Sequence, residues 1–378
     1  MKNELKRKFG RIATLVVAGA LVAGSLSAVG CGGDVTPAGG TGNGEGATGT
    51  TGTGDGLLTA RLNGAGATFP EPLYLEWIGE FVNGVQPGVA INYQGIGSGG
   101  GIQQLTQMTV DFGASDAPMK DEEIAAAEQA SGAKVLHIPT VFGAVAVAYD
   151  LPGVDGLKLD QETLAGIFLG TVTTWDDPAL VALNPGIELP SSPISAVHRS
   201  DSSGTTSIFT GYLAKVSSAW SDSVGAGKDV RWPVGIGGQG NDGVAAVIQQ
   251  QEGSIGYVEL SYATEVGLAT AELRNQAGSF VAPSLASTSA AGAGIDFPAD
   301  LRFSLSDSPA ADAYPIVGAT WILAYDTMSD PAKAEALRSF LTWALNEGAP
   351  LAEDLGYAPL PDSLRALALA KVAEVGIR

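Results

Sequence analysis

The chain has 378 residues, of which 45% are hydrophobic, and its 20 Lys and Arg against 40 Asp and Glu give a formal net charge of −20 at pH 7. This length predicts two domains with flanking segments. The acidic balance excludes nucleic acid as a partner, because a phosphate backbone requires a basic surface. One cysteine excludes an intramolecular disulfide and a cysteine-cluster metal site, and two histidines argue against a multi-histidine site. We expect neither a metal nor a cofactor.

Residues 1–30 have the pattern of an export signal. A basic head precedes an apolar stretch from Ile12 to Val29, and small residues lead into Cys31. A cysteine at the cleavage point resembles the bacterial lipoprotein box, although Ala28 stands where leucine is usual. The alternative is a single transmembrane anchor, since ~18 apolar residues can span a bilayer. We favour lipidation of Cys31, because the only cysteine lies where cleavage requires it.

The next segment, residues 31–56, is rich in Gly and Thr and has no apolar period. This composition predicts a flexible tether, and the 25 residues after Cys31 span roughly 25–30 Å root-mean-square. Without the signal, 15 basic and 39 acidic residues remain. A lipid anchor followed by a tether predicts an extracytoplasmic protein held close to a membrane, in a periplasm or on the outer face of the cell membrane.

From Leu57 onward, short apolar runs alternate with helix-like stretches. This alternation predicts an α/β fold with mainly parallel sheets. Asp121, followed by two glutamates, predicts a helix start, and residues 284–295 are interpreted as a low-complexity surface loop. Predicted strands cover residues 89–93, 110–114, 135–138, 141–148, 194–198, 254–258 and 316–325, and predicted helices cover 102–108, 121–131, 164–168, 178–183, 203–213, 244–250 and 331–346.

Four segments share one local pattern: a strand, then a turn of small or hydroxyl-bearing residues, then a helix. The N-terminus of a helix presents free N–H groups and partial positive charge, which suit an anion. For any one segment alone, a helix cap is the better interpretation, but four in one chain, one of them with an arginine, favour an oxyanion pocket. They are GAGATFP (64–70), GIGSGGG (95–101), ASDAP (114–118) and RSDSSGT (199–205).

Two classes of enzyme compete with this interpretation. GIGSGG at 95–100, with Asp116 about twenty residues on, fits the fingerprint of a dinucleotide site. A diffusible cytosolic cofactor is unexpected in an exported protein, however, and the motif does not open its domain. A serine hydrolase would require G-x-S-x-G, which is missing around Ser98 and Ser203. We therefore expect a binding protein rather than an enzyme.

Several motifs, in one consistent order over about residues 58–375, resemble the PstS family, the phosphate-binding proteins of the high-affinity phosphate ABC importer. They include NYQGIGS (92–98), VDFGASDAP (110–118) and GGQGNDG (237–243). The resemblance implies a two-lobed, type II periplasmic-binding-protein-like α/β fold with two crossing strands. It implies capture of inorganic phosphate between the lobes and delivery to the transmembrane permease subunits; we also expect a monomer. The expected lobes are residues 57–139 plus 316–378, and residues 140–315.

The resemblance also implies a set of phosphate ligands. Phe69 and Gly204 would contribute backbone N–H groups, and the serines and threonines would contribute hydroxyl or N–H groups. Arg199 would bind the anion with its guanidinium and pair with Asp201, and Asp116 would accept the hydrogen of a protonated ligand oxygen. The implied ligands are Thr68, Phe69, Ser98, Asp116, Arg199, Ser203, Gly204 and Thr205.

Two positions depart from the family pattern: Gly99 stands where many relatives have a second serine, and Ser202 where many have glycine. Asn241 and Asp242, in a glycine-rich segment, are candidates to line the cleft, but we favour a structural turn. The chemistry of the ligand agrees with the implied set, because neutral N–H and hydroxyl donors can surround four phosphate oxygens without burying a large net charge. The acidic surface does not prevent anion binding, since remote charges are screened over ~8 Å in physiological salt.

Overall fold

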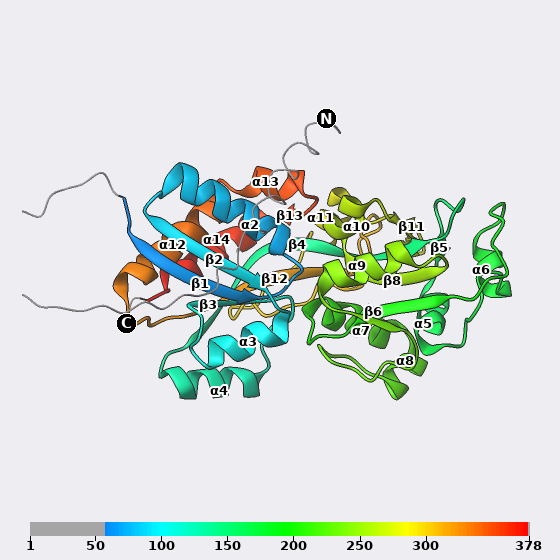
Figure 1. Cartoon of the computed structure of the whole chain (residues 1–378), viewed down its shortest axis with the longest axis horizontal. Coiled ribbons are helices and arrows are strands. Elements are labelled where there is room, and N and C mark those ends of the chain that lie inside the picture. Colours follow the sequence, from blue (N-terminus) through cyan, green and yellow to red (C-terminus); the bar gives the residue numbers. More distant parts are fainter. Residues whose placement is uncertain (1–56, 377–378) are drawn as a thin grey trace, which may run out of the picture. The chain divides into compact units, whose positions relative to one another are not determined.

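Strand β4 (Val135–Asp150) connects the two halves of the sheet in the computed structural model, which describes residues 57–376 (Figure 1). Up to Ala144 it pairs antiparallel with β12 (Val317–Tyr325), and from Val145 it pairs with a second set of strands. We call the parts built on these two halves lobe 1 and lobe 2. The lobe boundaries expected from the sequence stay a prediction.

Lobe 1 contains the strand order β2-β1-β3-β12-β4, with β13 added on β4. Strand β1 is parallel to β2 and β3, so the carboxyl ends of these three strands meet at one edge. The elements are β1 (Ala60–Gly66), α2 (Glu71–Glu80), the π-helical turn η1 (Phe81–Val85), β2 (Val89–Gly95), α3 (Ser98–Thr106), β3 (Phe112–Ser115), α4 (Asp121–Ser131), α12 (Pro331–Asn346), α13 (Ala349–Asp354), β13 (Ala358–Pro359) and α14 (Asp362–Ala373).

Lobe 2 contains the order β4-β8-β6-β7, with β9 on β4, and a separate small sheet of order β11-β10-β5. Strand β6 is parallel to β7 and β8. The elements are β5 (Lys158–Leu159), α5 (Gln161–Leu169), α6 (Pro178–Leu183), β6 (Ser195–Arg199), α7 (Gly204–Val216), α8 (Ser218–Ser223), β7 (Ile236–Gly238), α9 (Gly240–Gln250), β8 (Ser254–Glu259), α10 (Leu260–Val266), β9 (Ala269–Thr270), β10 (Glu272–Arg274), β11 (Phe280–Val281) and α11 (Leu285–Ala291).

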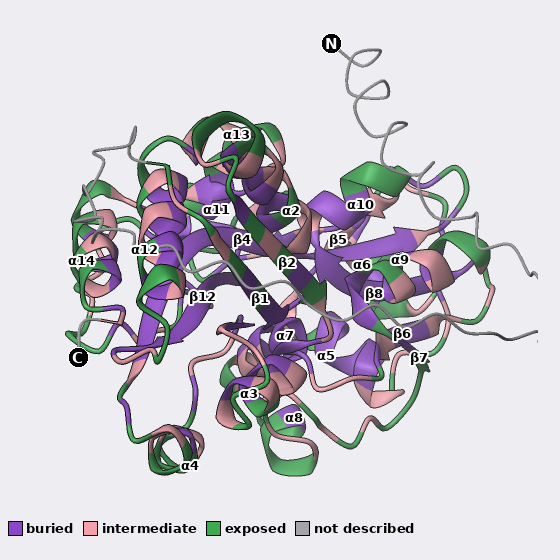
Figure 2. Cartoon of the chain, turned by 60° about the vertical axis from the view of Figure 1, so that its left-hand side comes forward, coloured by how far each residue is buried: buried purple, intermediate pink, exposed green. Residues whose placement is uncertain are grey.

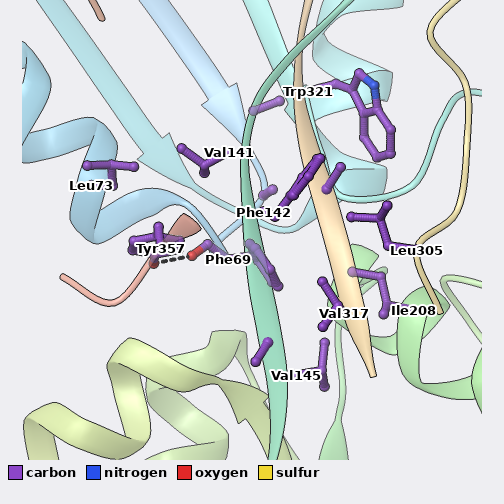
Figure 3. Close-up of a cluster of buried hydrophobic side chains, with 14 of the residues drawn as sticks. Phe69, Leu73, Val141, Phe142, Val145, Ile208, Leu305, Val317, Trp321 and Tyr357 are labelled. Atoms are coloured by element: carbon purple, nitrogen blue, oxygen red, sulfur yellow. Dashed lines mark hydrogen bonds between the residues drawn. The ribbon is translucent and has the colours of Figure 1, made fainter. Parts of the chain in front are cut away.

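The core runs through the junction of the lobes. Every residue of β12 is buried, and so is every residue of β4 from Leu136 to Tyr149. Figure 2 shows these strands in purple, the colour of buried residues. Strands covered on both faces have nearly continuous apolar sequences, which is why the sequence pattern located them. Phe69, Phe142 and Trp321 belong to the apolar cluster at this junction (Figure 3). Truncating a side chain of this size to alanine typically costs ~3–5 kcal/mol.

Most predicted elements are confirmed, and α4, α6 and α12 have the predicted bounds. The two strands predicted at 135–138 and 141–148 are instead one strand, β4. The register shifts beside Thr320, so that Val141 pairs with Thr320 and Pro139 with Trp321, which leaves Thr140 as the extra residue of a bulge. A bulge accommodates a proline within a strand, because the ladder is interrupted there.

Two further expectations are wrong. The sheet is mixed rather than mainly parallel, because β4 is antiparallel to both β12 and β8. The segment interpreted as a surface loop contains helix α11. Its N-cap is Ser284, whose hydroxyl accepts the N–H of Ser287 at 3.1 Å, and Thr288 and Ala291 are fully buried.

The predicted signal (1–30), the tether (31–56) and Cys31 lie outside the described residues. Within residues 57–376, no helix is both long enough and apolar enough to span a bilayer.

Candidate functional site

In lobe 1, the candidate residues follow the carboxyl ends of neighbouring parallel strands. Thr68 follows β1, Ser98 opens α3 after β2, and Asp116 follows β3. Ligands of α/β proteins commonly bind at this edge of a sheet. The Ser98 hydroxyl accepts the Asp116 N–H at 3.1 Å, and all three residues are at most 3% exposed. The local sequence thus brings two hydroxyls and one carboxylate to the same edge.

In lobe 2, the candidate residues lie between β6 and α7. Arg199 ends β6, and Ser203 caps α7 by accepting the Thr206 N–H at 3.0 Å. The Arg199 Nε donates to Asp201 Oδ1 at 2.7 Å. Burial acts to raise the pKa of Asp201, but the hydrogen bond and charge of Arg199 outweigh it, so that the pKa is lowered. The Asp201 carboxyl is therefore ionised at neutral pH.

The two lobes meet at these residues. A Cβ on Gly204 of lobe 2 would lie 2.3 Å from the Ser98 Oγ of lobe 1. The Asn241 side chain joins the lobes directly, since its Nδ2 donates to Thr68 Oγ1 at 2.9 Å and to Thr205 Oγ1 at 3.2 Å. The structure thus brings together all eight residues that the resemblance implies, in one buried region between the lobes.

Several buried backbone N–H groups of this region have no hydrogen-bond partner among residues 57–376. Within residues 57–376, no hydrogen bond uses the N–H of Phe69, Ser98, Gly204 or Thr205, although all four residues are buried. Buried N–H groups in proteins are almost always paired. Those of Ser98, Gly204 and Thr205 lie in the first turns of α3 and α7, which carry partial positive charge. This arrangement suits an anionic ligand.

Asp116 is a carboxylate placed among these donors. Its Oδ1 accepts the Thr320 hydroxyl at 2.8 Å, and the Ser98 hydroxyl lies 3.5 Å from its Oδ2. Burial raises the pKa of Asp116 to about 7, against the opposing effects of Thr320, Arg199 and Ser98. Near neutral pH this carboxyl can therefore share a proton with a protonated oxyanion.

Several supporting residues are missed by the sequence analysis. Tyr262 of lobe 2 donates its hydroxyl to the Thr68 carbonyl at 2.5 Å, and Tyr357 donates to the Phe69 carbonyl at 2.6 Å, the dashed contact in Figure 3. Asn241, interpreted as part of a structural turn, is the second residue of α9. Its glycine-rich segment follows β7 and opens a helix, so the strand–turn–helix pattern was a signal that could have found it.

A pocket of about 240 Å³ adjoins the site and includes Thr68 and Asp201 in its wall. Gly240 and the exposed Asp242, both from the start of α9, also line it.

Comparisons with known proteins identify the family of this chain. A family model described as a PBP superfamily domain matches residues 41–347. A phosphate-binding protein PstS from Pasteurella multocida is 43% identical over 307 residues, which cover 80% of this chain and 87% of that protein. The chain belongs to the PstS family. A second member, from Haemophilus influenzae, is 42% identical over 304 residues, 79% of this chain and 89% of its own.

A solved structure extends the similarity to the fold. A high-affinity periplasmic phosphate-binding protein, solved with bound phosphate, gives a TM-score of 0.67 at 23% identity, over 82% of this chain and 93% of that chain. The two-lobed α/β fold predicted from the sequence is confirmed by the family and by this likeness.

Proposed function

We propose that this protein captures inorganic phosphate between its lobes and delivers it to the permease of an ABC-type importer, as a binding protein rather than an enzyme. The observation that carries the proposal is that the buried N–H groups of Phe69, Ser98, Gly204 and Thr205 have no partner in the described part of the chain. Buried donors without acceptors are costly, and a tetrahedral oxyanion offers acceptors in several directions. The relatives named phosphate-binding protein PstS support phosphate as that anion.

Arg199 supplies the charge for this ligand. Among the described residues, it directs Nε and Nη2 to Asp201 and Nη1 to Thr205. A guanidinium has five N–H donors, so one donor on Nη1 and one on Nη2 remain for two ligand oxygens. The proposed ligands are Thr68, Phe69, Ser98, Asp116, Arg199, Ser203, Gly204 and Thr205.

Titration calorimetry on the purified protein tests the proposal. We expect one saturable site for inorganic phosphate that excess sulfate does not displace. We also expect phosphate to raise the thermal unfolding midpoint, because a ligand that binds only the folded state stabilises it, by ~2.7 kcal/mol at a hundred times its dissociation constant. Failure to bind phosphate, or equal affinity for sulfate, would overturn the assignment.

We further propose that Cys31 carries a lipid and that residues 32–56 tether the lobes to the membrane outside the cytoplasm. The proposal is supported by the signal-like segment that ends at the only cysteine. Cys31→Ser is expected to release or missort the protein, measured by membrane fractionation. Membrane retention equal to wild type would contradict the lipid anchor and favour an uncleaved helix.

A further inference from the structure

Asn241 has an amide whose orientation is fixed by its surroundings. Asn241 is fully buried, and its side-chain Oδ1 accepts the backbone N–H of Glu259 at 3.0 Å. A backbone N–H can only donate, so the atom facing it must be the amide oxygen. The Nδ2 group therefore faces the opposite side, where the Thr68 and Thr205 hydroxyls lie.

Both threonine hydroxyls are fully used as acceptors. Thr68 Oγ1 accepts the Asn241 Nδ2 at 2.9 Å and the Asn241 backbone N–H at 3.3 Å. Thr205 Oγ1 accepts the Asn241 Nδ2 at 3.2 Å and the Arg199 Nη1 at 3.3 Å. A hydroxyl has two lone pairs and one hydrogen. Each threonine is thus left with one O–H donor, and no hydrogen bond within residues 57–376 uses that hydrogen.

We propose that Asn241 is a positioning residue of the phosphate site: it joins Thr68 of lobe 1 to Thr205 of lobe 2 and commits both hydroxyl hydrogens to the ligand. The inference rests on the proposed function and goes beyond the ligand set given above. The hydroxyl hydrogens of Thr68 and Thr205 must each meet an unprotonated oxygen of the ligand. Asp116 instead accepts the hydrogen of a protonated ligand oxygen. Asn241 and Asp116 together therefore orient the ligand with its hydrogen toward Asp116.

The contact also links closure of the lobes to ligand binding. Thr68 lies on lobe 1, and two groups of lobe 2 hold it: the Asn241 amide at its hydroxyl and the Tyr262 hydroxyl at its carbonyl. The Asn241 contact to Thr68 exists only when the lobes are together. Its loss should therefore speed ligand dissociation and leave association with the open form nearly unchanged.

Calorimetry and stopped-flow dissociation of inorganic phosphate from Asn241 variants of the full chain test the inference. Asn241→Ala should weaken binding ~10–100-fold, mainly through faster dissociation, the scale of one or two lost hydrogen bonds. Asn241→Asp should weaken it further, because a carboxylate has no hydrogen to donate and both threonines would turn their hydrogens toward it. In a Thr68→Val background, Asn241→Ala should cost less than ~3-fold, because its main partner is already gone.

Asn184 provides a matched control. It is also a buried asparagine of lobe 2, and its Nδ2 donates to the carbonyls of Lys158 and Leu180 within that lobe. Asn184→Ala should lower the thermal midpoint of the ligand-free protein and leave phosphate affinity unchanged. If Asn241→Ala does not fold, Asn241→Ser, which keeps a donor, serves in the same cycle.

The outcomes separate the two proposals. Wild type that binds no phosphate overturns the proposed function itself. Wild type that binds phosphate, with Asn241→Ala within ~2-fold of it, overturns only the role of Asn241. Strict additivity of the Asn241 and Thr68 substitutions, or an Asn241→Asp variant that binds as well as Asn241→Ala, also overturns that role.

Discussion

Ser202 of lobe 2 fills the space that a side chain on Gly99 of lobe 1 would occupy. A Cβ on Gly99 would lie 2.4 Å from the Ser202 Cβ and 2.2 Å from its Oγ, and the Gly99 N–H donates to the Ser202 carbonyl at 2.9 Å. The family resemblance implies that many relatives have serine at position 99 and glycine at position 202. We therefore expect these two differences to compensate each other across the contact between the lobes.

This contact predicts that Gly99→Ser alone weakens phosphate binding and that adding Ser202→Gly restores it. The extra side chain obstructs closure, and overpacking typically costs ~1–3 kcal/mol, which corresponds to about a 5- to 150-fold loss of affinity. Calorimetry on both single variants and the double variant measures the effect. Gly79→Ser is the control, because a Cβ at that position would meet nothing within 4 Å apart from its chain neighbours and the backbone of its own helix. A double variant as weak as Gly99→Ser would contradict the compensation.

Helix α7 offers a second matched pair of glycines. A Cβ on Gly204 would lie 2.3 Å from Ser98 Oγ and 2.6 Å from Asp116 Oδ2. A Cβ on Gly211 would meet nothing within 4 Å apart from its chain neighbours and the backbone of its own helix. We expect Gly204→Ala to reduce phosphate affinity at least ~10-fold, on the scale of overpacking. Gly211→Ala should leave affinity unchanged and stabilise the fold by ~0.4–1 kcal/mol, because alanine restricts the unfolded chain. Equal affinities of the two variants would place Gly204 away from the ligand.

Glu259 predicts a pH dependence of stability. It is fully buried at the junction of β8 and α10, its Oε1 has no partner among the described residues, and its Oε2 accepts the Ser261 N–H at 2.8 Å. Burial raises its pKa from 4.5 to about 8, although hydrogen bonds from Ser261 oppose the shift. Between these two values the unfolded chain releases a proton that the folded chain keeps. The contribution of this carboxyl to stability is therefore complete below pH 4.5 and is lost progressively up to about pH 8.

Glu259→Gln, a neutral side chain of the same shape, should remove this dependence. Urea unfolding of phosphate-free protein at about pH 5 and about pH 8 measures it. The stability of the variant relative to wild type should rise between the two pH values. Equal changes in both proteins would mean that Glu259 is ionised in the folded state.

The sequence predicted those features that depend on local spacing. Phe69, Ser98 and Gly204 lie in short glycine- and hydroxyl-rich segments beside helix starts. One such segment alone indicates only a helix cap; the occurrence of four in one chain, together with the family resemblance, indicated an anion site. The two separate strands predicted on either side of Pro139 were wrong. The bulge that accommodates this proline within one strand depends on pairing with β12, which lies far along the chain. Helix α11 was missed because its alanines and serines have weak patterning and its burial depends on tertiary packing.

The supporting groups of the site could not be predicted in this way. Thr320 donates a hydrogen bond to Asp116, from which it is separated by 204 positions in the sequence. Asn241 donates one to Thr68, at a separation of 173 positions. No local pattern marks a threonine within a buried strand as a partner of a distant carboxylate. The folded sheet, rather than any motif, places these groups at the edge where the ligands converge.

The ion pair of Arg199 with Asp201 predicts a non-additive result. Arg199→Ala removes the guanidinium and leaves the Asp201 carboxylate, which lies beside the proposed anion, without its partner. We expect the free energy of phosphate binding to become less favourable by ~1.5–3 kcal/mol, the scale of a charged hydrogen bond. The Arg199→Ala, Asp201→Ala double variant should bind better than Arg199→Ala, because the repulsion is gone. Calorimetry measures the difference, and an Arg199→Ala affinity equal to wild type would place the guanidinium outside the site.

Asp116 is expected to decide between phosphate and sulfate. At neutral pH phosphate carries at least one hydrogen and sulfate carries none. An ionised Asp116 can accept the phosphate O–H but faces only lone pairs on sulfate, and a site built around a ligand hydroxyl can reject an analogue lacking it by ~10⁴–10⁵. Because the pKa of Asp116 is about 7, the carboxyl becomes protonated as the pH falls and can then donate to either ion.

The ratio of phosphate to sulfate affinity should therefore be high near pH 8 and fall as the pH decreases through about 7, chiefly because sulfate binds better. In Asp116→Asn the ratio of phosphate to sulfate affinity should be low, and residue 116 should add no pH dependence to it, because an amide donates to either ion at every pH. The exposed Asp242, in the wall of the neighbouring pocket, is the control, and Asp242→Asn should keep the wild-type profile. Competition calorimetry with both ions at pH 6, 7 and 8, values on both sides of the Asp116 pKa of about 7, measures this ratio for wild type and the two variants. If wild type and Asp116→Asn share one ratio across this range, the carboxyl of Asp116 does not recognise the ligand's hydrogen.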